Sequence, residues 1–347
     1  MYKRDKHTEN GSLKLPEAAC NTMLKLGSIS LDVPFYQAPL SGYTDRAMRV
    51  LAHKYGAPLS YTGVILAKIA LHKKAFNRLY FQPSVDEGLV GAQILGGDPE
   101  TMAEAAAAFA NVGFDLIDLN FACPAPKVLR RHSGGYLLKE PEAAIKIMQF
   151  VRDSVSCPVT IKLRAGFDKS QESMDKFWQI CQGAVAEGID ALIIHGRSVK
   201  ELYRDKGDWE IISEVKRRFP QATIIGSGDL MDAEVIVEKL KTSGLDGVII
   251  ARGAIGNPWI FNETRALWEG RPKPERPSLA EQGEVYLKHY EMIAETRPML
   301  KSVRYFRKFS VGYCKHHPQR KMIQADLIAA RSRDDLYAAV KKWYGVG

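Results

Sequence analysis

Eight short apolar segments with the pattern of β-strands recur along the chain, and segments with helical periodicity separate most of them. The first strand-like segment is Phe35-Tyr-Gln-Ala-Pro-Leu, and the other seven are 59–63, 88–95, 114–120, 158–164, 191–195, 222–227 and 247–251. The clearest helical segments between them are 99–112, 141–155, 173–187 and 232–243. Strands that alternate with helices form parallel sheets. The α/β fold that we predict is a (β/α)₈ TIM barrel, with an open doubly wound sheet as the alternative.

Changes of composition divide the chain around this barrel. Residues 1–23 lack periodicity and are expected to form an N-terminal extension. The barrel is expected to occupy residues 24–269, to begin with a hairpin at 24–35 and to use Thr44 as its first helix cap. A proline-rich linker at 270–277 would then lead to a small C-terminal all-helical domain at 278–347. The helical patterns in that domain cover 279–296, 299–316 and 334–344.

The sequence shows no signal of a membrane, secreted or metal-binding protein. No apolar run reaches membrane-spanning length, and the first ten residues are polar and of mixed charge. The five cysteines are scattered and include no Cys-x-x-Cys pair, so we expect reduced thiols and no metal site. We therefore predict a cytoplasmic protein, which we expect to be a monomer. The net charge of +9 favours a polyanionic partner.

A cysteine directly follows one of the predicted strands. The segment from Asp115 to Pro124 alternates apolar and acidic residues and then turns at Asn120. Cys123 therefore lies just past the carboxyl end of a strand, where the catalytic groups of β/α proteins collect. Lys127, with two arginines close behind it, makes this loop basic, and a thiol near positive charge is a candidate reactive group. A small buried structural cysteine is the alternative.

Polar residues end the later strands in the same way. The set comprises Asn120, Lys162, His195, the turn Ser227-Gly228-Asp229, and Arg252. Their separations of 25 to 42 residues fit one βα unit each, so we expect these side chains to share one site. The glycines and the arginine after the last two strands are typical of a phosphate site. Gln93 adds an amide, and Lys162 could hold positive charge against an anionic ring, which together favour FMN.

The predicted helical domain carries most of the excess positive charge. Between residues 298 and 325 there are seven Lys or Arg residues and no acidic residue. Lys301, Arg304 and Lys308 fall near one face of a helix. A face of this kind can simply be solvated, but the lack of compensating acids favours binding to nucleic acid.

Six motifs in order resemble those of the tRNA-dihydrouridine synthases, and they cover nearly the whole chain from Leu24 onward. They are Ala38-Pro-Leu-Ser-Gly-Tyr-Thr-Asp45, Asp118-Leu-Asn-Phe-Ala-Cys-Pro124, Ile161-Lys-Leu-Arg-Ala-Gly166, Ile194-His-Gly-Arg-Ser198, Gly226-Ser-Gly-Asp229 and Ala251-Arg-Gly-Ala-Ile-Gly-Asn-Pro-Trp-Ile-Phe261. Residues 304–309 also resemble the B-type bacterial enzymes. The resemblance implies an FMN-binding barrel with a helical domain, NADPH as electron donor and uridine in tRNA as substrate.

The resemblance also implies roles for individual residues. Cys123 would be the catalytic acid. The cofactor contacts would be Pro39, Leu40, Ser41, Gln93, Lys162, His195, Ser227, Gly228, Asp229, Ala251 and Arg252. The residues expected to contact tRNA are Asn120, Lys127, Arg197, Lys301, Arg304 and Lys308. The chain departs from the family pattern at Ala122 and Ser227, where Gly and Asn are usual, and at the bulky His132 of the active-site loop.

Two other functions share part of this pattern. A small-molecule flavin reductase of the dihydroorotate dehydrogenase type has a barrel, FMN and an active-site cysteine, but it does not need a basic helical domain. A non-catalytic tRNA-binding protein needs the basic domain, but it does not need Lys162 and His195 at the ends of strands.

Overall fold

A computed structural model describes residues 23–346, except 73, 75 and 77–81. The predicted N-terminal extension therefore lies outside the described residues, apart from Met23. In the part of the chain that is described, no helix combines the length and the apolar character needed to cross a membrane.

Eight parallel strands form the barrel, with a short additional strand, β5 (Ile65–Leu66), beside one of them. Their spatial order is β3-β11-β10-β9-β8-β7-β6-β4, and β3 and β4 also lie next to each other, so the sheet nearly closes. The TIM-barrel prediction is confirmed, and the open sheet is excluded. The strands are β3 (Phe35–Gln37), β4 (Leu59–Tyr61), β6 (Leu89–Leu95), β7 (Leu116–Phe121), β8 (Val159–Arg164), β9 (Ala191–His195), β10 (Ile224–Ser227) and β11 (Gly247–Ile250).

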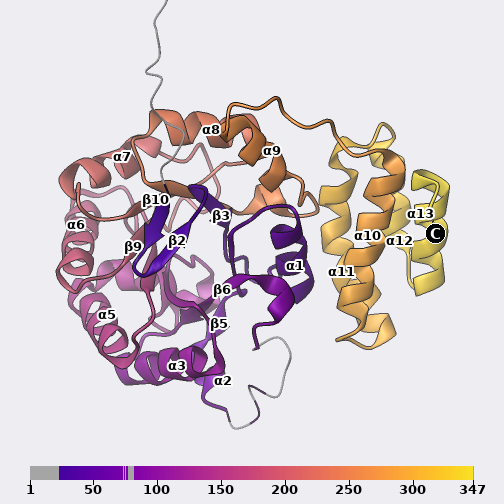
Figure 1. Cartoon of the computed structure of the whole chain (residues 1–347). Helices are drawn as coiled ribbons and strands as arrows, with labels where there is room; N and C mark the ends of the chain where they lie inside the picture. Colours follow the sequence, from indigo (N-terminus) through magenta and orange to yellow (C-terminus); the bar gives the residue numbers. More distant parts are fainter. Residues whose placement is uncertain (1–22, 73, 75, 77–81, 347) are drawn as a thin grey trace, which may run out of the picture.

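Helices surround the barrel on its outside (Figure 1). They are α1 (Arg46–Lys54), α2 (Ala67–Ala70), α3 (Pro99–Val112), α5 (Pro141–Ser154), α6 (Gln171–Ala186), α7 (Trp209–Arg218), α8 (Ala233–Thr242) and α9 (Ile260–Trp268). The short α4 (Pro126–Leu129) instead lies in the loop that follows β7. The sequence determines the limits of α3 clearly: the Asp98 carboxylate caps it by accepting from the Thr101 N–H at 2.9 Å, and Gly113 ends it at φ 103°. Its predicted bounds are therefore confirmed.

The cap predicted for α1 was wrong by one residue. The Asp45 carboxylate accepts from the Met48 N–H at 3.0 Å and is the actual cap. The Thr44 hydroxyl instead exchanges hydrogen bonds with the backbone of Leu40, both at 3.1 Å. Thr44 therefore stabilises the turn that precedes the helix.

The hairpin predicted at the start of the barrel is present as β1 (Leu24–Leu26) and β2 (Ile29–Leu31). Its leucines are buried and pack against Tyr36, Tyr61 and Leu116 inside the barrel. The hairpin thereby closes the amino-terminal end of the barrel (Figure 1).

The C-terminal region is helical and packs against the side of the barrel that carries α1 (Figure 1). It consists of α10 (Leu279–Ala294), α11 (Met299–Tyr313), the 3₁₀ turn η6 (Cys314–His316), α12 (Arg320–Ala329) and α13 (Arg333–Tyr344). Helix α12 was not predicted from the sequence. The Gln319 side chain does not cap this helix, and few apolar residues of α12 are buried. Phe306, Phe309 and Tyr313 share one apolar core with Met48 and Trp259 of the barrel.

A buried histidine in this core makes the stability of the protein dependent on pH. His289 is 1% exposed on α10, and burial lowers its pKa to about 3. In the unfolded chain its pKa is about 6.5, so the unfolded state binds the extra proton as the pH falls from about 6.5 toward 3. The neutral imidazole therefore contributes to the free energy of unfolding above about pH 6.5. This contribution is lost as the pH falls from about 6.5 toward 3.

We expect that His289→Gln will weaken this pH dependence. Between pH 7 and pH 5, the parent should lose about 2 kcal/mol more of its free energy of unfolding than the variant. Urea unfolding at the two pH values, followed by circular dichroism, measures this difference. Equal losses in the two proteins would show that His289 is not responsible.

Candidate active site

A pocket opens at the carboxyl ends of the barrel strands and, together with the open solvent at its mouth, contains about 840 Å³ of space. All the residues predicted to bind the cofactor line it, and so do Asn120 and Cys123. Because the carboxyl ends of parallel strands meet at one end of a barrel, residues that are distant in the sequence come together here.

A hydrogen-bonded network across three strands lies beneath the pocket and reaches it through Gln93 and Asn120. The Asp118 carboxylate accepts from the Gln93 amide and from the Thr160 hydroxyl, both at 2.6 Å. The Asn120 amide donates to the Gln93 Oε1 at 2.8 Å. Burial raises the pKa of Asp118 to about 6, against the hydrogen bonds from Thr160 and Gln93. Asp118 was not among the predicted site residues, although it begins one of the quoted motifs.

Lys162 provides the positive charge of the pocket wall. It stands opposite Asn120 in the register of β7 and β8. Burial, together with the nearby Arg164, lowers the pKa of Lys162 to about 8, while Asp118 opposes both effects. The ammonium group is therefore mostly charged at neutral pH and poorly solvated, so an anionic ligand group would attract it strongly.

The backbone around Cys123 is fixed on both sides. The Asn120 side-chain oxygen accepts from the N–H groups of Ala122 at 3.1 Å and Cys123 at 2.9 Å. The Cys123 carbonyl accepts from the Gly135 N–H at 3.0 Å. Gly134 has φ 60°, and a Cβ atom there would lie 3.1 Å from the Cys123 Cβ, so the returning loop needs glycine at this point. The partly exposed thiol is thus held at the pocket by backbone contacts.

Arg164 and Tyr203 line the same pocket, and the sequence analysis assigned neither a role. The Arg164 Nε donates to the Ala122 carbonyl at 3.0 Å, next to Cys123. The guanidinium groups of Arg164 and Arg252 lie 5.5 and 4.6 Å from the centre of the Tyr203 ring. Arg164 could have been noticed, because it stands two residues after Lys162 on the same strand. Tyr203 lies in a loop whose sequence offers no such signal.

Arg197, which was predicted to contact tRNA, is not among the residues that line the pocket. Its side chain is 3% exposed and donates to the Asp229 carboxylate at 2.7 Å and to the Arg204 carbonyl at 2.9 Å. Partial burial opposes ionisation of Asp229, but hydrogen bonds from the Gly207 N–H and Arg197 keep the pKa of Asp229 below its usual range. The ion pair with Asp229 therefore holds the Arg197 side chain inside the protein.

Arg197 also determines which ring nitrogen of His195 carries the proton. Burial and the surrounding cations hold the pKa of His195 well below its usual range, so this imidazole is neutral. An Arg197 N–H lies 3.2 Å from the His195 Nε2. Arginine has only donors, so Nε2 accepts and the proton of the ring is on Nδ1.

The predicted basic residues outside the pocket occupy different surroundings. Lys127 is exposed on α4, and Lys301 and Arg304 are exposed on α11. Lys308 lies on the same face of α11, but its ammonium group donates to the Gly42 carbonyl of the barrel and lies over the ring of Tyr305. Its side chain is therefore half-buried and already has a partner within the protein.

The departures from the family pattern fit the structure locally. His132 adopts φ 49°, a conformation that glycine accepts more readily, and its ring stacks on Tyr136 at 4.3 Å. Ala122 is buried beneath the Arg164 guanidinium, and Ser227 lines the pocket.

Comparison with known families agrees with this geometry. Residues 36–341 match the family described as dihydrouridine synthase. The chain belongs to the dihydrouridine synthase family. A tRNA-dihydrouridine synthase B of Shewanella oneidensis is 30% identical over 321 residues, which are 92% of this chain and 98% of the relative. A probable tRNA-dihydrouridine synthase of Rhodobacter capsulatus is 34% identical over 271 residues, 78% of this chain and 82% of the relative.

Solved structures outside the dihydrouridine synthases share the barrel. Histamine dehydrogenase from Rhizobium superposes with a TM-score of 0.54 at 14% identity, over 79% of this chain and 51% of that protein. An amine oxidase of Pseudomonas geniculata that acts on 6-hydroxypseudooxynicotine gives a TM-score of 0.56 at 14% identity, over 78% of this chain and 52% of that chain. At these identities the likeness concerns the fold alone.

Proposed function

We propose that this dihydrouridine synthase reduces the C5–C6 double bond of specific uridines in tRNA, with FMN as the bound cofactor and NADPH as the electron donor. One observation carries the proposal: in a chain of this family, one pocket places the Cys123 thiol and the Lys162 ammonium at the same barrel mouth. Residues 24–269 would perform the chemistry, and residues 278–347 would hold the tRNA.

The residues of the pocket suit FMN. Arg252 and the turn at residues 227–229 would form the phosphate end, and Gly228 at φ 132° leaves space that a Cβ atom, only 2.9 Å from the His195 ring, would fill. Lys162 suits the part of the ring system that becomes anionic on reduction. Pro39, Leu40 and Ser41 provide a wall on the neighbouring side.

The side chains of the protein have separate tasks in the proposed reaction. When bound in this pocket, reduced FMN would supply the hydride for C6 of the uracil ring. Cys123 donates a proton to C5, and Asn120 keeps the thiol in place through the Cys123 N–H. Arg164, held against the Ala122 carbonyl, stabilises the thiolate that remains after proton donation.

The proposal is tested with the purified protein and tRNA that lacks dihydrouridine. We expect flavin absorbance, FMN as the cofactor released on denaturation, and NADPH-dependent formation of dihydrouridine detected by nucleoside mass spectrometry. Turnover of a free pyrimidine with unchanged tRNA would favour the small-molecule reductase instead. Tight tRNA binding without any flavin after reconstitution would favour the non-catalytic protein.

A further inference from the structure

Helix α11 contacts a loop whose first half lines the pocket. Pro39, Leu40 and Ser41 face the pocket, and Gly42 follows them directly. The Gly42 carbonyl accepts from the Tyr305 hydroxyl at 2.9 Å and from the Lys308 ammonium group. Two side chains of the helical region thus hold one carbonyl of the pocket loop.

The half-buried Lys308 ammonium lies against aromatic rings. It is 3.2 Å from the centre of the Tyr305 ring and 4.9 Å from that of Tyr43. Burial lowers the pKa of Lys308 to about 8, while the nearby Asp45 carboxyl opposes this effect. A hydrogen bond from a charged donor is stronger than one between neutral groups, and the Tyr305 hydroxyl adds a second bond to the same carbonyl, so two donors restrain Gly42.

The same helix touches a second pocket loop near its C-terminal end. A Cβ atom on Gly312 would lie 1.9 Å from the Ile255 carbonyl oxygen, and one on Gly256 would lie 2.6 Å from the Phe309 carbonyl oxygen. Only glycine permits this contact between two backbones. The loop at residues 251–256 begins with Ala251 and Arg252, which line the phosphate end of the pocket. Helix α11 therefore supports two walls of the pocket.

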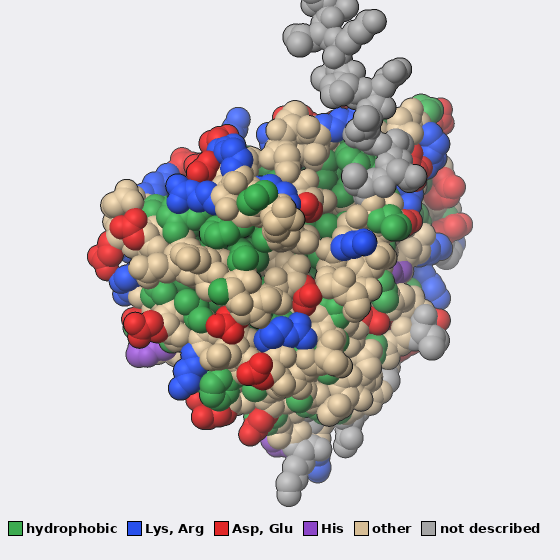
Figure 2. All heavy atoms as spheres, turned by 60° about the vertical axis from the view of Figure 1, so that its left-hand side comes forward, with side chains coloured by type: hydrophobic (Ala, Val, Ile, Leu, Met, Phe, Trp, Pro, Cys, Tyr) green, Lys and Arg blue, Asp and Glu red, His purple; other side chains and the backbone are tan. Residues whose placement is uncertain are grey.

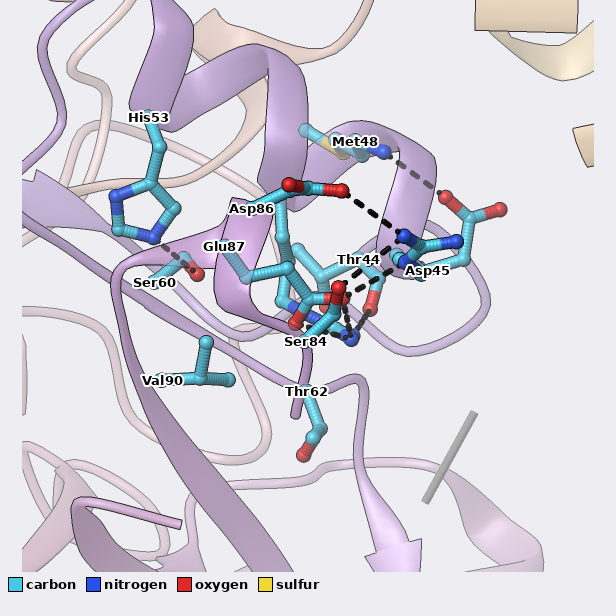
Figure 3. A network of polar contacts seen from close by, with 12 residues as sticks. Thr44, Asp45, Met48, His53, Ser60, Thr62, Ser84, Asp86, Glu87 and Val90 are labelled. Atoms are coloured by element: carbon cyan, nitrogen blue, oxygen red, sulfur yellow. Dashed lines mark hydrogen bonds and ion pairs between the residues drawn. The ribbon is translucent and has the colours of Figure 1, made fainter. Parts of the chain in front are cut away.

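The barrel itself holds the first loop from its other side. Figure 3 shows the cluster around Thr44, Asp45, Ser84, Asp86 and Glu87. A guanidinium N–H of Arg49 donates to the Thr44 carbonyl at 3.2 Å, and the fully buried Arg49 pairs with Glu87 at 2.9 Å. The barrel thus fixes the loop at Thr44, and α11 fixes it two residues earlier, nearer the pocket.

We propose that Tyr305 and Lys308 are positioning residues for the flavin. They hold Gly42, and through it they keep Pro39, Leu40 and Ser41 against the cofactor. The helical region would then contribute to flavin binding as well as to RNA binding. The identity of the ligand as FMN rests on the proposed function. The anchoring of the loop at Gly42 rests only on its contacts with Tyr305 and Lys308.

The test uses Tyr305→Phe, which removes only the hydroxyl, and Lys308→Met, which removes only the ammonium group. Lys288→Met is the matched control, because Lys288 is exposed on α10 and its loss changes the net charge equally. We expect the Kd of the apoprotein for FMN to rise about tenfold in each of the two variants and to stay unchanged in the control. Hydrogen–deuterium exchange in the peptide covering residues 38–45 should also become faster in those two variants alone.

Lys308→Arg should restore much of the FMN affinity, because its guanidinium can also donate to the Gly42 carbonyl. If Lys308→Met does not fold, Tyr305→Phe decides, since it keeps the aromatic ring. Unchanged FMN affinity and unchanged exchange at residues 38–45 in Tyr305→Phe would overturn the inference. A parent protein that binds no FMN would instead refute the proposed function, and the exchange experiment would still test the anchor.

Discussion

Cys123→Ala should reduce the rate of dihydrouridine formation by about 10²- to 10⁴-fold while the purified protein keeps its yellow colour. This is the range expected when a general acid is removed. The flavin should be retained, because the predicted cofactor contacts lie on other strands and loops of the pocket. The local backbone should be retained as well, since Asn120 and Gly135 hold residue 123 through its main chain. Nucleoside mass spectrometry and the visible spectrum measure the two properties separately.

Cys157→Ala is the control for this substitution. Cys157 is partly exposed like Cys123, but it precedes β8 at the amino-terminal end of the barrel. We expect its loss to leave the rate unchanged. If Cys123→Ala forms dihydrouridine at the parent rate, another group supplies the proton, and the assignment of Cys123 is wrong.

The fold could be predicted because local signals coincide with the periodicity. For α3, a capping Asp98, Pro99 in the first turn and Gly113 at the end mark the limits that the structure shows. Strand β9 has its predicted bounds, Ala191–His195. By contrast, α12 has no side-chain cap and buries little, so only tertiary packing reveals it.

The pocket could be predicted because the geometry of the barrel brings strand ends together. The contacts of the long basic side chains could not be predicted from the sequence. Periodicity indicates the face of a helix or strand on which a residue lies, but not the group with which its side chain interacts. Arg197 turned inward to Asp229, and Lys308 turned to the Gly42 carbonyl. Arg164 lay within a quoted motif, but its role depends on the Ala122 carbonyl of the neighbouring loop.

The surface expected to bind tRNA differs in its charge from the flank of the barrel. Figure 2 shows a face of the barrel on which acidic and basic side chains are mixed. Arg217 and Arg218 on α7, for example, both pair with Glu214. Lys301 and Arg304 are exposed on α11 within a stretch that has no acidic residue. Uncompensated cations of this kind bind phosphates and release counterions.

Lys301→Glu combined with Arg304→Glu should therefore weaken tRNA binding roughly tenfold or more at low salt and flatten its salt dependence. Each lost phosphate contact should reduce the slope of log K against log salt by about 0.9, so the double variant should lose about 2. FMN affinity should not change, because neither side chain lines the pocket. Filter binding of tRNA at several salt concentrations measures both effects.

The matched control is Lys25→Glu combined with Lys241→Glu, which changes the net charge of the protein equally. Both lysines are exposed, one on the hairpin that closes the barrel and one near the end of α8, and both lie at the end opposite the pocket. If the effect depended on net charge alone, the control would weaken binding as much as the α11 variant does. If the α11 variant binds tRNA with the parent affinity and salt slope, that face is only solvated. The tRNA must then be held at the pocket rim, where Arg164, Tyr203 and Arg252 are the next residues to test.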